Sequence, residues 1–191
     1  MKFVLAICIA LLMTQVAAQF LRAQETPGTP PQSSPAPAVE RKQRTEDETR
    51  KRLQQLACGP SGVHFSHHTD KGTQALPEQP PDKGLIYVIR TKTWWGAAGQ
   101  ANLAVDGKWI GVNRVGTYFY MELDPGPHYF CMKEPMETPA LLSLVIEKGK
   151  TYYLKQSFTM EGIDLDLLDE EKGKQYVSKY HKSIFEEKQK K

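Results

Sequence analysis

Three histidines, His64, His67 and His68, lie within five residues and form the clearest metal-like pattern in the sequence. The ligands of one zinc ion must converge to about 2 Å from it. In an extended segment, His64 and His68 share a face but lie about 13 Å apart. Because a three-histidine site would need a sharp turn between Ser66 and His68, we predict surface histidines and no bound cofactor. A metal site at the three histidines is the weaker alternative.

Two adjacent tryptophans, Trp94 and Trp95, form the second candidate site. Neighbouring residues in an extended chain point apart, so only one of the two can easily be buried. An exposed tryptophan offers a large contact area for a sugar or a protein partner. We therefore treat Trp94 and Trp95 as possible partner-binding residues. The alternative is that one fills the core and the other is half-buried.

The sequence lacks the patterns that would indicate an enzyme or a nucleic-acid-binding protein. It contains no Gly-x-Ser-x-Gly nucleophile elbow and no glycine-rich phosphate loop. His128 follows a proline turn and begins a strand, so we expect it to form hydrogen bonds at the strand end. The formal net charge is only +3, from 25 basic and 22 acidic residues, and no basic face stands out. We predict no catalytic residues and no nucleic-acid partner.

The first residues are typical of a secretory signal peptide. A lysine at position 2 precedes an apolar run over 3–16, which is shorter than the roughly 20 residues of a membrane span. Val16 and Ala18 fit a cleavage site before Gln19, and a second possible site follows Ala23. We predict a signal peptide over residues 1–18 and export to the periplasm or the exterior, with no membrane span after cleavage.

Cleavage would remove Cys8 and leave two cysteines, Cys58 and Cys131, in an oxidising compartment. Exported proteins rarely keep free thiols, so the sequence predicts a disulfide between them. Such a bond would attach a polar helix to the β core. The alternative is two separate thiols.

Three segments flank the predicted β domain. Residues 19–44 are rich in proline and serine and predict a disordered spacer. Residues 45–84 predict a short, mostly polar helix that ends near Gly59, followed by an extended lead-in. Residues 169–191 predict an amphipathic C-terminal helix, with apolar side chains at helical spacing up to Ile184, and a basic tail.

Alternating apolar and polar residues indicate β-strands from Leu85 onward, separated by frequent turn residues. Asp106-Gly107 is the strongest hairpin signal, because a two-residue turn requires positive φ. About seven strands predict an antiparallel β-sandwich over residues 85–168. The predicted strands cover residues 84–90, 100–105, 108–112, 117–123, 128–133, 141–147 and 151–160.

The order of four pieces resembles the bacterial domain-of-unknown-function family 2846 over roughly residues 85–174. These pieces are a first strand ending in Arg90, the hairpin "VDGKWIGV", the turn "DPGPHYF" and the strand "GKTYY". The segments "LACGPSGVHFS" and "HYFCMK" resemble a secreted, cysteine-bearing subset. The resemblance implies a small exported β domain and brings no known activity, so no catalytic residue is carried over.

We therefore expect a non-enzymatic module of the bacterial envelope that binds an envelope protein or glycan. A structural domain without a ligand is the alternative, and a histidine-based metal-binding protein is a weaker one.

Overall fold

The computed structural model describes residues 37–72, 75–92, 99–134, 138–159 and 162–188, so Trp94 and Trp95 lie outside the described residues. The chain divides into two units, residues 1–43 and 44–191, and all described strands lie in the second. The elements are α2 (Pro37–Ala57), β1 (Phe65–Asp70), β2 (Gly84–Arg90), β3 (Ala101–Val105), β4 (Lys108–Asn113), β5 (Thr117–Leu123), β6 (Gly126–Lys133), β7 (Ala140–Ile146), β8 (Thr151–Thr159), β9 (Gly162–Leu168), α3 (Glu170–Lys179) and β10 (His181–Glu187).

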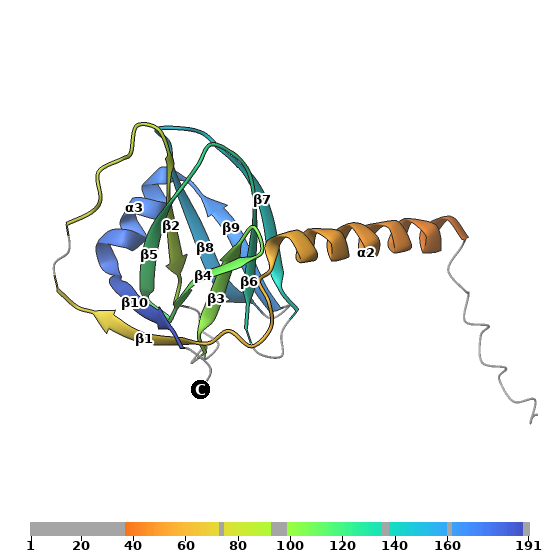
Figure 1. The fold of residues 1–191 in the computed structure, drawn as a ribbon, viewed down its shortest axis with the longest axis horizontal. Coiled ribbons are helices and arrows are strands. Elements are labelled where there is room, and N and C mark those ends of the chain that lie inside the picture. Colours follow the sequence, from red (N-terminus) through yellow and green to blue (C-terminus); the bar gives the residue numbers. More distant parts are fainter. Residues whose placement is uncertain (1–36, 73–74, 93–98, 135–137, 160–161, 189–191) are drawn as a thin grey trace, which may run out of the picture. The chain divides into compact units, whose positions relative to one another are not determined.

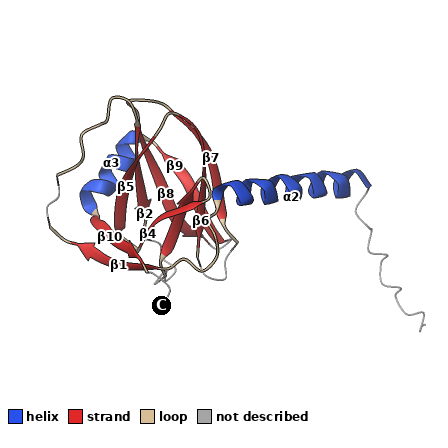
Figure 2. Ribbon diagram, viewed as in Figure 1, coloured by secondary structure: helices blue, strands red, loops and turns tan. Residues whose placement is uncertain are grey.

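The strands form two packed sheets, which confirms the predicted β-sandwich (Figures 1 and 2). One sheet has six strands in the order β1-β10-β5-β2-β8-β9, and the other has four in the order β4-β3-β6-β7. The apolar core lies between the sheets and is built by alternate residues of both, as period-two burial requires. Its fully enclosed members include Ile86, Val88, Leu103, Phe130, Met132 and Leu154.

Strand β2 is buried on both faces, which explains its continuous apolar run. Ile86 and Val88 face the core between the sheets, whereas Leu85, Tyr87 and Ile89 face a second cluster beneath α3. The pairing of β2 also shows that the prediction of purely antiparallel sheets was wrong. This strand runs antiparallel to β5 but parallel to β8, and β10 runs parallel to β5.

The C-terminal segment contains a shorter helix than predicted, followed by a strand that was not predicted. Helix α3 ends at Lys179, and the residues that follow form β10. Tyr176, Val177 and Tyr180 keep their helical spacing against the sheet, but Ile184 belongs to β10. In β10, Ser183 is buried and lies in register with Thr69 of β1. Tertiary pairing with β1 and β5 has overridden the local helical preference.

Two further boundaries differ from the prediction. β1 lies in the expected lead-in, and both β1 and β10 belong to the six-stranded sheet, so the strands of the sandwich extend beyond residues 85–168. Helix α2 begins at Pro37, so part of the expected spacer is helical. Proline is compatible with a first helical position, where the backbone N–H has no helical partner, and the charged residues after it favour helix.

The predicted disulfide between Cys58 and Cys131 is present, with the two Cα atoms 5.0 Å apart. It joins the end of α2 to the outer face of the four-stranded sheet. Trp109 Nε1 donates to the Pro60 carbonyl at 2.7 Å, and the Gly107 amide donates to the Ala57 carbonyl at 3.2 Å. Residues 57–60, at and just after the end of α2, are therefore held by one covalent and two polar contacts. One turn or more earlier, Arg50 Nη2 donates to the Pro139 carbonyl at 3.0 Å. Among the described helices, none is both long and apolar enough for a membrane span.

The Asp106-Gly107 turn joins β3 to β4 with positive φ at both residues, as the hairpin prediction requires. His128 Nδ1 lies 2.6 Å from Asp106 Oδ2, and its Nε2 lies 2.8 Å from the Asp124 carbonyl oxygen. The amide of Tyr129 donates to Asp106 Oδ1 at 2.9 Å. His128 therefore has the predicted role of a hydrogen-bonding residue near a strand end.

Candidate binding groove

The three clustered histidines do not converge. His64 precedes β1, and His67 and His68 are neighbours within it, so their side chains leave opposite faces of the strand. The described residues contain no group of three histidine, cysteine or acidic side chains placed to hold a metal ion.

A concave surface lies on the outer face of the six-stranded sheet. Tyr87 of β2, Tyr118 of β5 and Tyr153 of β8 project there from strands that lie side by side. The rings of Tyr87 and Tyr153 are nearly parallel, with centroids 5.3 Å apart, and Tyr118 lies 6.1 Å from Tyr87. All three residues are buried. Together they form an aromatic floor.

Helix α3 forms one wall of this surface (Figure 1). Asp169 caps its N-terminus by accepting from the Lys172 amide at 2.8 Å. Gly173 lies directly on Tyr153, where the Cβ of any other residue would overlap the ring. Glycine, otherwise unfavourable inside a helix, therefore allows α3 to approach the sheet. Val177 is buried on the same cluster and fixes the helix above the floor.

The space between the sheet, α3 and the segment before β2 is a groove of about 740 Å³. This volume falls within the range of about 300–1,000 Å³ that is usual for small-molecule sites. Four lysines line the groove, and no carboxylate does so among the described residues. We call it the tyrosine groove. Its principal lining residues are Lys71, Leu76, Leu85, Tyr87, Tyr118, Thr151, Tyr153, Lys174, Val177, Lys179, Tyr180 and Lys182.

The lysines of the tyrosine groove differ in their partners. Lys174 pairs with Glu170 at 2.6 Å. Lys182 donates to the Tyr120 hydroxyl at 3.2 Å, and its Nζ lies 4.6 Å from the centre of that ring. Lys71 and Lys179 are exposed and have no ion pair with any described residue. Lys71 and Lys179 therefore add positive charge at the rim, although the carboxylates of Asp70 and Glu170 lie close enough to influence the pKa values of Tyr118 and Tyr153.

The phenols of the floor are neutral at ordinary pH. Burial raises the pKa of Tyr87 to about 12, and the neighbouring tyrosines add to this shift. Burial likewise raises the pKa of Tyr118 and of Tyr153. Within the described part of the protein, these three hydroxyls form no hydrogen bond. They are therefore available as donors and acceptors for a ligand.

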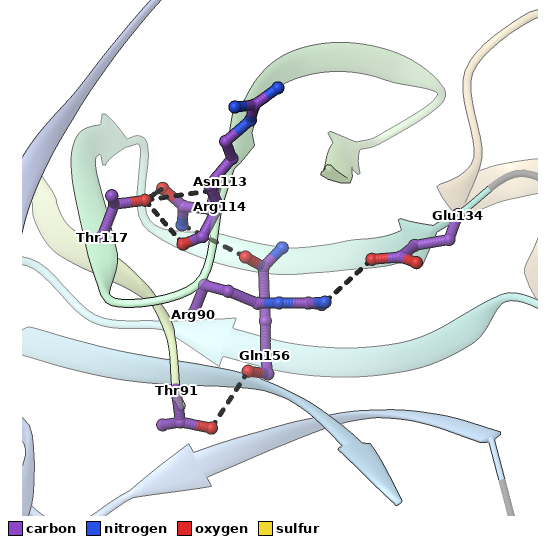
Figure 3. A network of polar contacts seen from close by, with 7 residues as sticks. All are labelled: Arg90, Thr91, Asn113, Arg114, Thr117, Glu134 and Gln156. Carbon is purple, nitrogen blue, oxygen red and sulfur yellow. Dashed lines mark hydrogen bonds and ion pairs between the residues drawn. The ribbon is translucent and has the colours of Figure 1, made fainter. Parts of the chain in front are cut away.

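A separate buried polar network lies between the two sheets (Figure 3). Arg90, at the end of β2, is fully buried, and its Nη2 donates to Glu134 Oε1 at 2.9 Å. Its guanidinium carbon lies 3.9 Å from the centre of the Phe158 ring. Burial lowers the pKa of Arg90 to about 10, and the Glu134 carboxylate opposes that shift, so Arg90 is charged at neutral pH.

The network continues through Asn113 of β4. Its Nδ2 donates to Gln156 Oε1 at 3.1 Å and to the Val88 carbonyl at 2.9 Å, and its Oδ1 accepts from Thr117 at 3.2 Å (Figure 3). These side chains come from both sheets. Because Arg90, Asn113 and Gln156 are fully buried, the network links the sheets and offers no surface to an external ligand.

The polar network also connects to the groove. Thr91 directly follows Arg90, and both its amide and its hydroxyl donate to the Gln156 carbonyl. The next amide, that of Lys92, donates to the hydroxyl of Tyr180 in the groove wall at 3.3 Å. The buried network thus helps to position one edge of the tyrosine groove.

Sequence reasoning did not identify the tyrosine groove. Its floor comes from three strands that are distant in sequence, and its wall includes Gly173, which resembles a helix breaker. The available signal was that β2, β5 and β8 each contain tyrosine, and that β2 is apolar at successive positions. A continuous apolar run indicates a second packed face, but without the strand order it does not show that the rings meet.

Comparison with known proteins shows which part of the chain is similar to a known family. Residues 80–165 match the model of a family described as "Protein of unknown function (DUF2846)", which confirms the resemblance inferred from the sequence. An uncharacterized protein of Haemophilus influenzae is 27% identical over 121 residues, which cover 60% of this chain and 71% of that protein. The matched family segment contains the tyrosine floor, whereas α3 and β10 lie beyond it.

Proposed function

We propose that this protein, which contains a DUF2846 domain at residues 80–165, is an exported, non-enzymatic module that binds an acidic glycan of the cell envelope in the tyrosine groove. The observation that carries this proposal is the combination of an aromatic floor with a lysine rim that lacks carboxylates. The floor belongs to the family segment, and the rim comes from the segments before and after it.

The chemistry of the groove favours a sugar polymer over a wholly apolar ligand. The three floor tyrosines are buried, so they offer a sugar their hydroxyls as hydrogen-bonding groups and not their ring faces. The exposed Leu76 and the half-buried Tyr180 of the groove provide apolar surface for the C–H faces of a sugar. The unpaired Lys71 and Lys179 favour a ligand that carries carboxylate or phosphate groups. A neutral glycan would use the floor but not the rim.

The groove supports binding rather than catalysis. Its lining supplies neutral phenols and lysines, and the described lining residues contain no carboxylate that could act as a general acid or base. Glycoside hydrolysis normally requires a pair of carboxyl groups flanking the bond that is cleaved.

Two observations support placement in the envelope. The apolar run over residues 3–16 has the length and flanking charge of a signal peptide. The Cys58–Cys131 disulfide is of the kind that persists in oxidising compartments. The export proposal predicts that the mature chain begins at Gln19.

Calorimetry with two related glycans tests the binding proposal. Muramidase-digested peptidoglycan fragments carry carboxylates, whereas chitooligosaccharides of the same length have a similar ring backbone without them. We expect the purified protein to bind the acidic fragments at least ~10-fold more tightly, because two lysine contacts of about 0.7 kcal/mol each correspond to that factor. Added salt should weaken this binding.

The double variant Lys71→Gln/Lys179→Gln should lose most of this preference. The matched control is Lys108→Gln/Lys133→Gln, which makes the same charge change at exposed positions of the four-stranded sheet and should leave binding intact. Equal affinity for the neutral glycan would refute the role of the rim. Absence of binding to either glycan would instead favour a structural domain or a protein partner.

A further inference from the structure

A second cleft, of about 540 Å³, lies at the opposite end of the β1–β10 pairing from the tyrosine groove. In the register of these two strands, Lys182 lies opposite Asp70 at the groove end. Glu187 lies opposite Phe65 at the other end. Five residue steps of strand separate the two ends, or about 17 Å. The second cleft is therefore a distinct site. Its lining residues are His64, Phe65, Ser66, His67, Gln100, Arg114 and Lys188.

The side chains of this cleft are cationic or polar, apart from Phe65. Arg114 and Lys188 are exposed, and neither has a side-chain ion pair with a described residue. No carboxylate is among the described lining residues, although Glu186 and Glu187 lie nearby on β10. Two fixed positive charges thus converge on one concave surface without a counterion from the described protein.

The cleft also contains hydrogen-bonding groups that lack partners. Nε2 of His67 is enclosed and has no hydrogen-bond partner. The amide of Gln100 forms no hydrogen bond within the described residues. The Ser66 hydroxyl leaves the opposite face of β1 from His67 and donates to the Glu186 carbonyl at 3.2 Å. An enclosed ring nitrogen without a partner is costly unless a ligand or water satisfies it.

From this arrangement we infer that the cleft formed by His64, His67, Gln100, Arg114 and Lys188 binds a phosphate group, either as free phosphate or as a phosphomonoester. A guanidinium matches phosphate oxygens with two parallel hydrogen bonds, and lysine adds a point charge. A hydrogen phosphate both donates and accepts, so it can pair with the imidazoles of the cleft in either tautomer. This inference is independent of glycan binding in the tyrosine groove.

The same geometry disfavours a metal cation. Arg114 lies close enough to lower the pKa of His67, although burial is the larger cause. A positive neighbour that opposes protonation of the imidazole also opposes its binding of a divalent cation. The histidines that the sequence suggested as metal ligands therefore serve an anion better.

Titration of the purified protein with inorganic phosphate, followed by calorimetry and by the ³¹P resonance, tests the inference. We expect saturable binding with one site per chain, and Arg114→Gln should weaken it at least ~10-fold, as the loss of a charge-assisted bidentate contact implies. His67→Gln should weaken it less. The matched control Arg52→Gln makes the same change on exposed α2 and should leave binding unaltered.

Two further titrations identify the source of the phosphate group. Tighter binding of glycerol 1-phosphate than of inorganic phosphate would indicate a phosphomonoester headgroup, and the reverse would indicate the free ion. Lack of saturation by either compound would overturn the inference. So would equal loss of binding in Arg52→Gln, or zinc binding that is abolished by His67→Gln.

Discussion

At the scale of single residues, Arg90 combines full burial with a charge. It is fully buried, and its ion pair with Glu134 is accompanied by contact with the Phe158 ring. Its Nε and Nη1 have no hydrogen-bond partner. A buried guanidinium with incomplete hydrogen bonding depends strongly on its one carboxylate for compensation.

Removal of that carboxylate should therefore be costly. Glu134→Gln preserves shape but leaves the guanidinium unpaired, and we expect the free energy of unfolding to fall by about 3 kcal/mol. Urea unfolding followed by tryptophan fluorescence measures the change. Glu122→Gln, at an exposed position of β5, is the matched control and should change stability by less than ~0.5 kcal/mol. A similarly small effect for Glu134→Gln would show that the pair contributes little.

At the scale of elements, the end of α2 is attached to the four-stranded sheet chiefly through Cys58–Cys131. Most residues of the helix within 42–57 are exposed, so its own apolar contacts are few. Ala57 and Cys131 are buried together with the half-buried Trp109. The covalent bond therefore replaces an apolar face that the helix lacks.

Loss of the disulfide should release the helix before the sandwich unfolds. The bond closes a loop with a sequence separation of 73, for which chain entropy predicts about 4 kcal/mol of stabilisation as an upper figure. In Cys58→Ala/Cys131→Ala, trypsin should cut at Arg50, Lys51 and Arg52 much faster than in the wild type, and a resistant β core should remain. Unchanged cleavage rates would show that Trp109 and the backbone contacts suffice to hold the helix.

At the scale of the whole molecule, the tyrosines of the groove should make the free energy of unfolding fall at alkaline pH. Burial raises the pKa values of Tyr87, Tyr118, Tyr153 and Tyr180 in the folded protein. Below pH 10 these phenols are neutral in both states, so their stabilising effect is fully present. Above pH 10 the unfolded chain ionises first, and stability is lost as pH rises toward the folded pKa.

Tyr87 alone shifts from 10 to about 12, which corresponds to roughly 3 kcal/mol lost across that range at 1.36 kcal/mol per pKa unit. Urea midpoints measured at intervals from pH 8 to 12 should fall steeply above pH 10. Tyr87→Phe keeps the ring and removes the titrating group, so its curve should be flatter. Parallel curves for the two proteins would assign the alkaline loss to other groups.

The sequence by itself determined the features that depend on local pattern. Period-two alternation located seven strands to within about two residues of their observed bounds, because one face of each packs into the core. The Asp106-Gly107 hairpin followed from its need for positive φ. The cysteine pairing followed from the expectation that export would leave two cysteines, Cys58 and Cys131, in an oxidising compartment.

Only the tertiary structure decided the features that depend on strand order. β10 is a strand because β1 and β5 supply its hydrogen bonds, although its sequence continues the helical spacing of α3. The tyrosine groove exists because β2, β5 and β8 are neighbours and Gly173 lets a helix lie on them. Arg114, which directly follows β4, lies near His67 because β4 passes beside β1. Contacts between residues that are distant in sequence cannot be read from a local pattern. The residues next to each partner in the chain carry no information about where the other partner lies in the fold.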